Sequence, residues 1–281
     1  MKILVTGGAG FIGSNLVDKL IKDGHDVIVI DNLSTGKKEN INSKASFSQI
    51  DLGNKECVPY LNILMKNVDV VFHMAAIGRI QPSFDNPEDY INTNFNGTYE
   101  VVKFCTENNI PLIYAGSSSK HSGRYKNPYT FSKDIGEDII KLYQTHFGLK
   151  ASIARFYNVY GPYQLLEGDY TTLIGRWLNN IEKGLRCEIY GDGEQRRVFT
   201  YVNDIVEALV LIMQKNAYGH EFEWGRGQNI SLNEIVDNLN GGFRSEQIYN
   251  EALIYGINSG LYKKMYHYKK LFESPDIEKE M

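Results

Sequence analysis

The chain has 281 residues, of which 42% are hydrophobic, and it carries a formal net charge of −4. This length supplies enough apolar residues for a packed core of roughly one or two domains. A slight negative charge gives no basis for binding nucleic acid or an anionic membrane, so we expect neither partner. The longest late apolar run, Ala208–Met213, is too short to span a bilayer.

Cysteine and histidine are few and scattered. The three cysteines, Cys57, Cys105 and Cys187, lie far apart, which predicts reduced thiols and a cytoplasmic location. The six histidines lack the spacing of metal ligands, so we expect no metal site. The apolar run before the first glycines is predicted to be a strand and not a signal peptide.

Short apolar runs alternate with longer helical patterns. In chain order we predict a strand at Lys2–Thr6, a helix at Gly10–Asp23, strands at Asp26–Asp31 and Asp69–His73, a helical stretch at Tyr90–Asn108, a strand at Leu112–Ala115, a helix at Tyr129–Phe147 and a strand at Lys150–Tyr157. Continuous apolar strands separated by helices are typical of a parallel sheet covered on both faces. The sequence therefore predicts an α/β fold, a doubly wound parallel sheet of the Rossmann type with a smaller C-terminal substrate domain.

The regular pattern loosens after Tyr157. We predict a dinucleotide-binding domain at residues 1–162, to which residues 199–222 return with a helix at Asn203–Gln214. The small substrate-binding domain would comprise residues 163–281. Near the end, Leu261–Phe272 interleaves aromatic residues with lysines. This segment could form a nucleic-acid or membrane patch, but we favour a solvated amphipathic helix that covers the small domain.

Three glycines follow the first predicted strand at G-x-x-G-x-x-G spacing, Gly7, Gly10 and Gly13. A pyrophosphate must approach backbone closely there, and the following helix offers free N–H groups and a positive dipole end. A glycine string alone could be a simple tight turn. Its position between a strand and a helix instead indicates a dinucleotide site.

Asp31 ends the second predicted strand, eighteen positions after Gly13. A carboxylate there can accept hydrogen bonds from the adenosine ribose hydroxyls and would repel a 2′-phosphate, which favours NAD over NADP. Lys37 and Lys38 weaken that preference slightly, and Asp31 could instead cap the next loop. Asp51-Leu52, after the third strand, is placed to reach the adenine.

Tyr129 and Lys133 lie four residues apart at the start of a predicted helix, so they share one face. A nearby ammonium and the positive ring of NAD⁺ would favour a phenolate that can act as a base. The same spacing recurs by chance in many helices. The serines of Ala115–Ser119 strengthen the catalytic interpretation, because they follow a parallel strand at its carboxyl end, although a polar turn would have the same composition.

Several stretches together resemble one family. They are TGGAGFIGSNL, DNLSTG, HMAA, NFNGT, AGSSS, YTFSK, ARFYNVYGP and YGDGEQRRVFTYVND, spread from residue 3 to about residue 230. The chain is similar to the extended short-chain dehydrogenases/reductases, and within them to the NAD-dependent UDP-glucose and UDP-N-acetylglucosamine 4-epimerases. The resemblance implies a homodimer that pairs through Tyr90–Asn108 and Tyr129–Phe147.

The resemblance also implies roles for individual residues. Tyr129 would be the acid/base, Lys133 its partner and Ser118 the catalytic serine. The expected NAD-binding residues are Gly7, Gly10, Phe11, Ile12, Gly13, Asp31, Asn32, Ser34, Thr35, Gly36, Asp51, Leu52, Ala75, Ala76, Asn94, Tyr129, Lys133 and Tyr157. The expected substrate-binding residues are Ser83, Ser118, Asn158 and Arg197, with Arg196 as an alternative to Arg197.

The chain departs from this pattern in several places. Only ten residues separate Ser118 from Tyr129, and Ser119-Lys120 stand where dehydratases and decarboxylases often have an acid. Val198 replaces an aspartate. The usual C-terminal arginine-proline-glycine stretch is missing, since Arg244 is the only arginine after Arg226.

We therefore expect an enzyme that epimerises C4 of a UDP-hexose through a 4-keto sugar, with the hydride chemistry supplied by NAD. Two kinds of rival stay open. One is another reaction of the same keto sugar, namely dehydration, decarboxylation or reduction. The other is a non-catalytic NAD-binding regulator.

Overall fold

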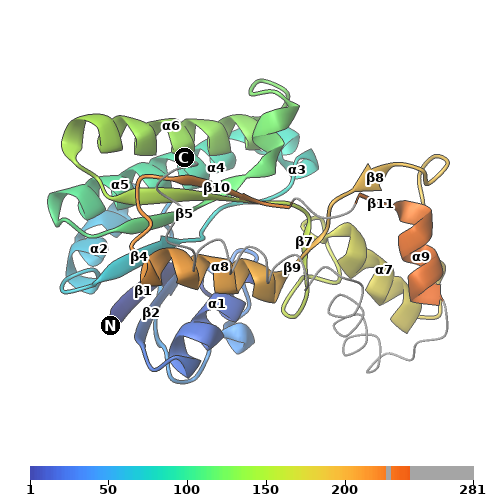
Figure 1. Cartoon of the computed structure of the whole chain (residues 1–281), viewed down its shortest axis with the longest axis horizontal. Coiled ribbons are helices and arrows are strands. Elements are labelled where there is room, and N and C mark those ends of the chain that lie inside the picture. The colour runs from blue at the N-terminus through green and yellow to red at the C-terminus, as the bar shows by residue number, and fades with distance from the viewer. Residues whose placement is uncertain (226–228, 241–281) are drawn as a thin grey trace, which may run out of the picture.

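A computed structural model of the chain describes residues 1–225 and 229–240 (Figure 1). Its centre is a seven-stranded sheet in the order β10-β6-β5-β4-β1-β2-β3, in which every neighbouring pair is parallel. The strands are β1 (Lys2–Thr6), β2 (Asp26–Asp31), β3 (Ser46–Gln49), β4 (Val70–His73), β5 (Leu112–Ser117), β6 (Ala151–Phe156) and β10 (Glu221–Trp224). The predicted doubly wound α/β fold is confirmed.

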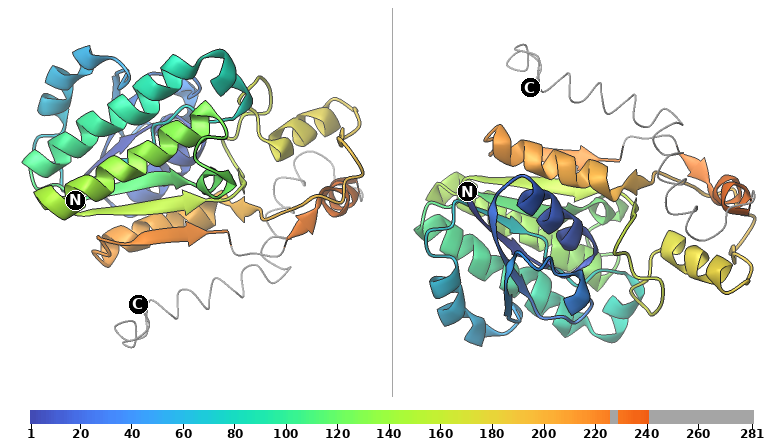
Figure 2. Two further views of the ribbon diagram at one scale, coloured as in Figure 1. Left: turned by 90° about the horizontal axis from the view of Figure 1, so that it is seen from above. Right: turned by 90° about the horizontal axis from the view of Figure 1, so that it is seen from below.

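Helices cover both faces of the sheet (Figure 2). One face packs against α1 (Phe11–Lys22) and α8 (Val202–Gln214), and the other packs against α2 (Val58–Leu64), α5 (Thr98–Glu107) and α6 (Pro128–Phe147). Strand β1 shows how the sequence produces this arrangement. Ile3 and Val5 enter the core beneath α1 and α8, whereas Leu4 enters the core on the other side. Because side chains alternate between faces and both faces are buried, the strand is a continuous apolar run.

The helical stretch predicted at Tyr90–Asn108 contains a change of helix type. It consists of α4 (Pro87–Ile91), a π-helix η3 (Asn92–Gly97) and α5. Such π-helical turns are rare and occur often at functional sites. Here the π-helix carries Asn94, whose side chain is fully buried.

The last strand of the sheet, β10, was not predicted. Its residues Glu221 and Glu223 give it a polar alternation instead of an apolar run. Both carboxylates bind Arg155 of the neighbouring strand β6, and Glu221 also pairs with Lys141 of α6, so positive side chains compensate the two charges. The partner lies far away in the sequence, and for that reason the pattern alone did not reveal the strand.

A smaller set of elements lies beyond the carboxyl edge of the sheet (Figure 1). It contains α7 (Leu173–Glu182), the antiparallel pair β8 (Arg196–Arg197) and β11 (Ile230–Ser231), and α9 (Leu232–Asn240). The parallel pair β7 (Val159–Tyr160) and β9 (Thr200–Tyr201) leads toward it. The division at residue 162 stays a prediction, and Arg244 and the helix predicted at Leu261–Phe272 lie outside the described residues.

The remaining short elements are η1 (Lys38–Asn40), η2 (Lys55–Cys57), α3 (Gln81–Asp85) and η4 (Ser118–Ser122). Within residues 1–225 and 229–240, no helix has the length and apolar character needed to cross a membrane.

Candidate active site

A cavity of about 1010 Å³ runs along the carboxyl ends of the parallel strands. Ligands of doubly wound sheets bind at this edge, and the volume is at the upper end of the usual range for small-molecule pockets. Of the residues predicted to bind cofactor or substrate or to act in catalysis, those on the cavity wall are Gly7, Gly10, Phe11, Ile12, Gly13, Asp31, Asn32, Ser34, Thr35, Asp51, Leu52, Ala75, Ala76, Ser118, Tyr129, Tyr157, Asn158 and Arg197.

The glycine loop has no room for side chains. A Cβ atom on Gly13 would lie 2.0 Å from the carbonyl oxygen of Gly7, and one on Gly7 would lie 2.6 Å from the Ala75 nitrogen. Gly7 also has a φ of 69°, which favours glycine. Helix α1 begins directly after Gly10, and no side chain caps its first N–H groups. The loop therefore fits the diphosphate of a dinucleotide.

Asp31 closes the same end of the cavity. Its carboxylate accepts hydrogen bonds from the backbone N–H of Ala9 at 3.0 Å and of Leu33 at 2.8 Å. Burial raises the pKa of Asp31, and these backbone hydrogen bonds oppose the rise. Gly36 lies behind this region, where a Cβ would lie 2.9 Å from the backbone of Ala9. These contacts hold the carboxylate against the glycine loop and cap the following loop at Leu33, and the contact with a ribose stays a prediction.

The predicted tyrosine and a serine meet on the cavity wall, but the serine is Ser117. The Tyr129 hydroxyl donates to Ser117 Oγ at 3.1 Å, and Ser117 Oγ lies 2.9 Å from Ser119 Oγ. Ser118, the serine implied by the family pattern, lines the same cavity without this hydrogen bond. Strand β5 continues to Ser117, two residues beyond the predicted end at Ala115, and so brings Ser117 level with the tyrosine.

Lys133 lies behind Tyr129 and not on the cavity wall. Its ammonium is 4.2 Å from the centre of the Tyr114 ring, and the side chain is almost completely buried. Burial lowers the pKa of Lys133 to about 7, although the charge of Glu137 opposes this shift. Burial raises the pKa of Tyr129, whereas the Ser117 hydrogen bond and the charge of Arg79 lower it. The protein's own groups thus leave the Tyr129 pKa above its ordinary value, and its lowering by the positive ring of NAD⁺ stays a prediction.

Two further predicted residues do not line the cavity: Asn94 supports the site from behind, and Ser83 lies away from it. Asn94 donates to the Ile77 carbonyl at 3.0 Å and to Ser132 Oγ at 3.0 Å, and it accepts from the Ile77 N–H at 2.7 Å. It therefore fixes the loop after β4 against helix α6. Ser83 is fully buried and donates to the Ile80 carbonyl at 2.6 Å. It does not line the cavity, so its expected contact with the sugar has no support in this geometry.

The two arginines predicted for the substrate diphosphate point to different places. Arg197 lines the cavity and donates to Gln195 Oε1 at 2.8 Å. Arg196 instead donates to the Asn229 carbonyl and pairs with Glu234 at 3.1 Å. Asn158, also on the wall, donates to the Val198 carbonyl at 2.7 Å. The arrangement favours Arg197 over Arg196 as the cavity arginine.

Sequence reasoning missed part of the wall. Arg79 follows β4, His121 lies in the short loop after β5, and Tyr170 lies before α7. His121 Nε2 lies 2.9 Å from Glu223 Oε1, and its ring stacks on Tyr157. A systematic look at every segment that follows a parallel strand would have found Arg79 and His121, because all such segments meet at one edge.

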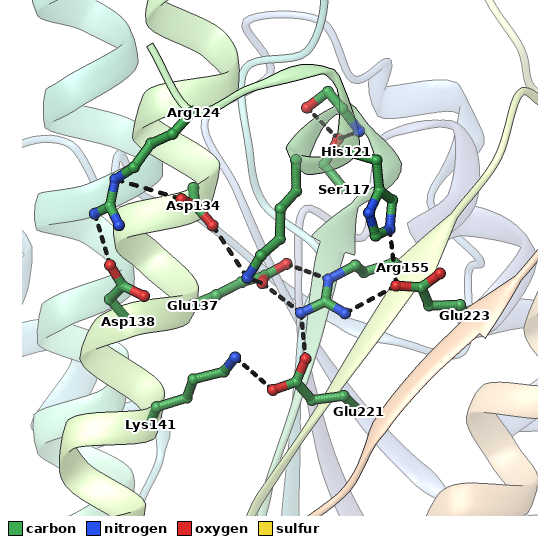
Figure 3. Close-up of polar contacts among 12 residues, drawn as sticks. Ser117, His121, Arg124, Asp134, Glu137, Asp138, Lys141, Arg155, Glu221 and Glu223 are labelled. Atoms are coloured by element: carbon green, nitrogen blue, oxygen red, sulfur yellow. Dashed lines mark hydrogen bonds and ion pairs between the residues drawn. The ribbon is translucent and has the colours of Figure 1, made fainter.

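An ion-pair cluster holds the short loop before Tyr129 onto helix α6 (Figure 3). The buried Glu137 carboxylate accepts from Arg155 Nε at 2.8 Å, and Lys120 Nζ binds it at 2.9 Å. Lys120 also pairs with Asp134 at 3.2 Å, and Arg124 pairs with Asp138 at 2.6 Å. Lys120 is thus bound in this cluster and does not line the cavity.

The sheet topology and the glycine loop define a dinucleotide-binding protein. Residues 3–225 match the model of the NAD dependent epimerase/dehydratase family, and the chain belongs to this family of enzymes. The family assignment confirms NAD as the expected cofactor.

Similar proteins include more than one kind of nucleotide-sugar enzyme. The "Putative UDP-glucose 4-epimerase" of Methanocaldococcus jannaschii is 37% identical over 89% of this chain and 85% of its own length. The UDP-N-acetyl-alpha-D-glucosaminuronate decarboxylase of Bacillus cytotoxicus is 30% identical over 85% of this chain and 79% of its own length. The crystal structure of UDP-glucose 4-epimerase with UDP-glucose from Thermotoga maritima has a TM-score of 0.80 at 31% identity, covering 87% of this chain and 84% of that chain.

We expect Arg197→Ala to raise the dissociation constant of UDP by at least about tenfold, because a hydrogen bond to a charged group contributes roughly 1.5–3 kcal/mol and ~1.4 kcal/mol is one decade. Arg197→Lys should recover only part of the loss, since an ammonium lacks the planar fork that meets two phosphate oxygens. Arg196→Ala is the matched control and should change the constant less. Calorimetric titration of the NAD-loaded variants measures these values. UDP binding unchanged in Arg197→Ala would place the diphosphate elsewhere, at Arg196 or at a lysine outside the described residues such as Lys263.

Proposed function

We propose that the protein epimerises C4 of a UDP-hexose. The observation that carries the proposal is the distribution of acid/base groups along the cavity. Among the described lining residues the only carboxylates are Asp31 and Asp51, and both lie at the glycine-loop end. The other end holds Tyr129 and its serine partner, whereas the lining residue His121 is bound to Glu223. Oxidation and reduction at one carbon need one acid/base group, whereas dehydration needs further groups to protonate the leaving hydroxyl and remove a second proton.

Tyr129 takes the proton of the sugar 4-hydroxyl in the first half of the reaction and returns it in the second. Ser117 Oγ, held by Tyr129 at 3.1 Å, orients that hydroxyl, and Ser118 lies beside it on the wall. The glycine loop and Asp31 would hold NAD, which when bound would accept hydride from C4 and return it. Between the two halves the 4-keto sugar, whose C4 is trigonal, turns so that the opposite face of C4 meets the cofactor.

Lys133 acts through its charge. With a pKa of about 7 it carries a proton for part of the time near neutral pH, and Glu137 one turn further along α6 favours the protonated form. A protonated Lys133 stabilises the phenolate of Tyr129 through its charge, from behind the cavity wall. Asn94 holds the loop after β4 against α6, and so fixes the position of Tyr129 relative to the cofactor.

The homodimer and the two-domain division are part of the same proposal. Leu142 and Phe147 are 47% and 59% exposed on α6, which leaves apolar surface on one of the two helices expected to pair. Residues after 162 would bind the nucleotide through Arg197.

The proposed reaction is tested by the mass and configuration of the product. The NAD-loaded protein is incubated with UDP-glucose and, separately, with UDP-glucuronate, and the products are analysed by mass spectrometry and proton NMR. Epimerisation leaves the mass unchanged and inverts C4. Loss of carbon dioxide from the uronate, or of water from either sugar, would assign the protein to the decarboxylases or dehydratases of its family instead.

A further inference from the structure

Arg79 is a cation on the cavity wall that the proposed mechanism does not use. It follows β4 in the segment that also contributes Ile77, Gly78 and Ile80 to the lining. Its backbone has a φ of 80°, a conformation that residues other than glycine seldom adopt. Its Nε donates to the Tyr170 carbonyl at 3.0 Å. That bond anchors one edge of the guanidinium and leaves the terminal nitrogens for another partner.

No carboxylate neutralises this arginine within the described part of the chain. Its one hydrogen bond there is to the Tyr170 carbonyl, and no described acid lies within ion-pair distance of it. The charged or titratable groups that act on it are Tyr129, Tyr90 and another cation, Arg176 of α7. Burial lowers the pKa of Arg79, which indicates a partly desolvated charge. Removing a charge from water is costly unless the charge is paired, so a partly desolvated arginine without a described acidic partner in a ligand cavity is suited to an anion of the ligand.

The position of Arg79 restricts where that anion lies. Its charge reaches Tyr129, the group that touches the sugar 4-hydroxyl in the proposed reaction. The Tyr129 ring packs edge-on against Tyr90, whose hydroxyl donates to the Gly78 carbonyl at 2.6 Å, next to Arg79 in the chain. Arg79 therefore belongs to the sugar end of the cavity. The substituents nearest a hexose C4 are the 3-hydroxyl and the C6 group on C5, and of these C6 becomes anionic when it is a carboxylate.

We propose that Arg79 binds the C6 carboxylate of a uronic acid, so that the preferred substrates are UDP-linked uronates and not neutral UDP-hexoses. This inference rests on the proposed function, because it takes Tyr129 as the residue at C4. A guanidinium meets a carboxylate through two parallel hydrogen bonds, which a neutral C6 hydroxymethyl group cannot reproduce. The sugar is then recognised by charge at a position adjacent to the reacting carbon.

The test compares three ligands, UDP, UDP-glucose and UDP-glucuronate, by calorimetric titration into NAD-loaded protein. The wild type should bind UDP-glucuronate at least about tenfold more tightly than UDP-glucose, a ratio equivalent to ~1.4 kcal/mol. Arg79→Gln should bring that ratio close to one, and Arg79→Lys should restore part of it. Arg176→Gln removes a nearby but exposed cation and should keep the wild-type ratio, which controls for general electrostatic attraction. UDP alone should bind wild type and Arg79→Gln alike, which also reports that the variant is folded.

Three other outcomes overturn the assignment, and a fourth bears on the proposed function alone. Equal binding of the two sugars by the wild type would show that no carboxylate is recognised, and this result stands even if Arg79→Gln does not fold. Weaker binding of UDP itself by Arg79→Gln would place the arginine at the diphosphate. An unchanged ratio with a shifted pH profile of turnover would place it on the Tyr129 phenolate. A wild type that prefers the uronate yet converts no nucleotide sugar would contradict the proposed function alone.

Discussion

Replacement of Tyr129 by phenylalanine should lower turnover of the nucleotide sugar by about 10²–10⁴-fold, the usual contribution of a general acid/base. The substitution removes the hydroxyl that donates to Ser117 and leaves the half-buried ring in place against Tyr90. NAD affinity should change little, because the glycine loop and Asp31 are untouched. Turnover by NMR and NAD binding by fluorescence titration give the two measurements.

Tyr125→Phe is the matched control for this experiment. Tyr125 lies four residues before Tyr129 and is 83% exposed, so the loss of its hydroxyl should leave turnover near the wild-type value. Wild-type turnover in Tyr129→Phe would remove the tyrosine from the mechanism. A comparable loss in both variants would mean that the loop before α6, and not the Tyr129 hydroxyl, is responsible.

The largest loss of stability is expected at Glu137. This carboxylate is 1% exposed and binds Arg155 through two nitrogens, at 2.8 and 2.6 Å, as well as Lys120 at 2.9 Å. Glu137→Ala would leave a buried guanidinium with only the more exposed carboxylates of β10. Removing one partner of a buried ion pair typically costs about 3–5 kcal/mol, because the remaining charge stays desolvated. The free energy of unfolding, measured in urea, should fall by roughly 3 kcal/mol or more.

Asp138, the next residue of α6, provides the comparison for Glu137. It pairs with Arg124 at 2.6 Å, but its side chain is 47% exposed. Exposed ion pairs contribute less than about 1 kcal/mol to stability, since water screens the charges and pairing restricts two otherwise mobile side chains. Asp138→Ala should therefore remain within about 1 kcal/mol of the wild type. Equal stability of the two variants would show that the cluster in Figure 3 does not depend on Glu137 as its centre.

The sequence was sufficient to predict those parts of the fold that depend on local pattern. Strands such as β1 are buried on both faces and are therefore continuous apolar runs, and the glycine spacing follows from the close approach of Gly13 to Gly7. Strand β10 escaped prediction because Glu221 and Glu223 are compensated by Arg155, a partner more than sixty positions away. Tertiary charge pairing here overrides the hydrophobic pattern on which strand prediction depends.

The residues of the candidate site, like the strands, could be predicted where local pattern decides their position and not where tertiary structure decides it. Tyr129 and Lys133 share a helix face, so their spacing alone brought them together. The choice between Ser117 and Ser118 depended on where β5 ends, and strand ends are the least reliable part of such predictions. Arg79 belongs to no motif. Only the fold places the segment after β4 beside helix α6 and α7, and so next to the tyrosine.

In the proposed reaction, one acid/base group and a recycled cofactor interconvert two C4 epimers. The most direct measurement follows the anomeric proton NMR signals while NAD-loaded protein acts separately on each member of an epimeric pair of UDP-hexoses or UDP-uronates. Both members should reach the same mixture, no reductant should be consumed, and Tyr129→Phe should slow both approaches alike. Conversion in one direction only, or a product that has lost carbon dioxide or water, would contradict it.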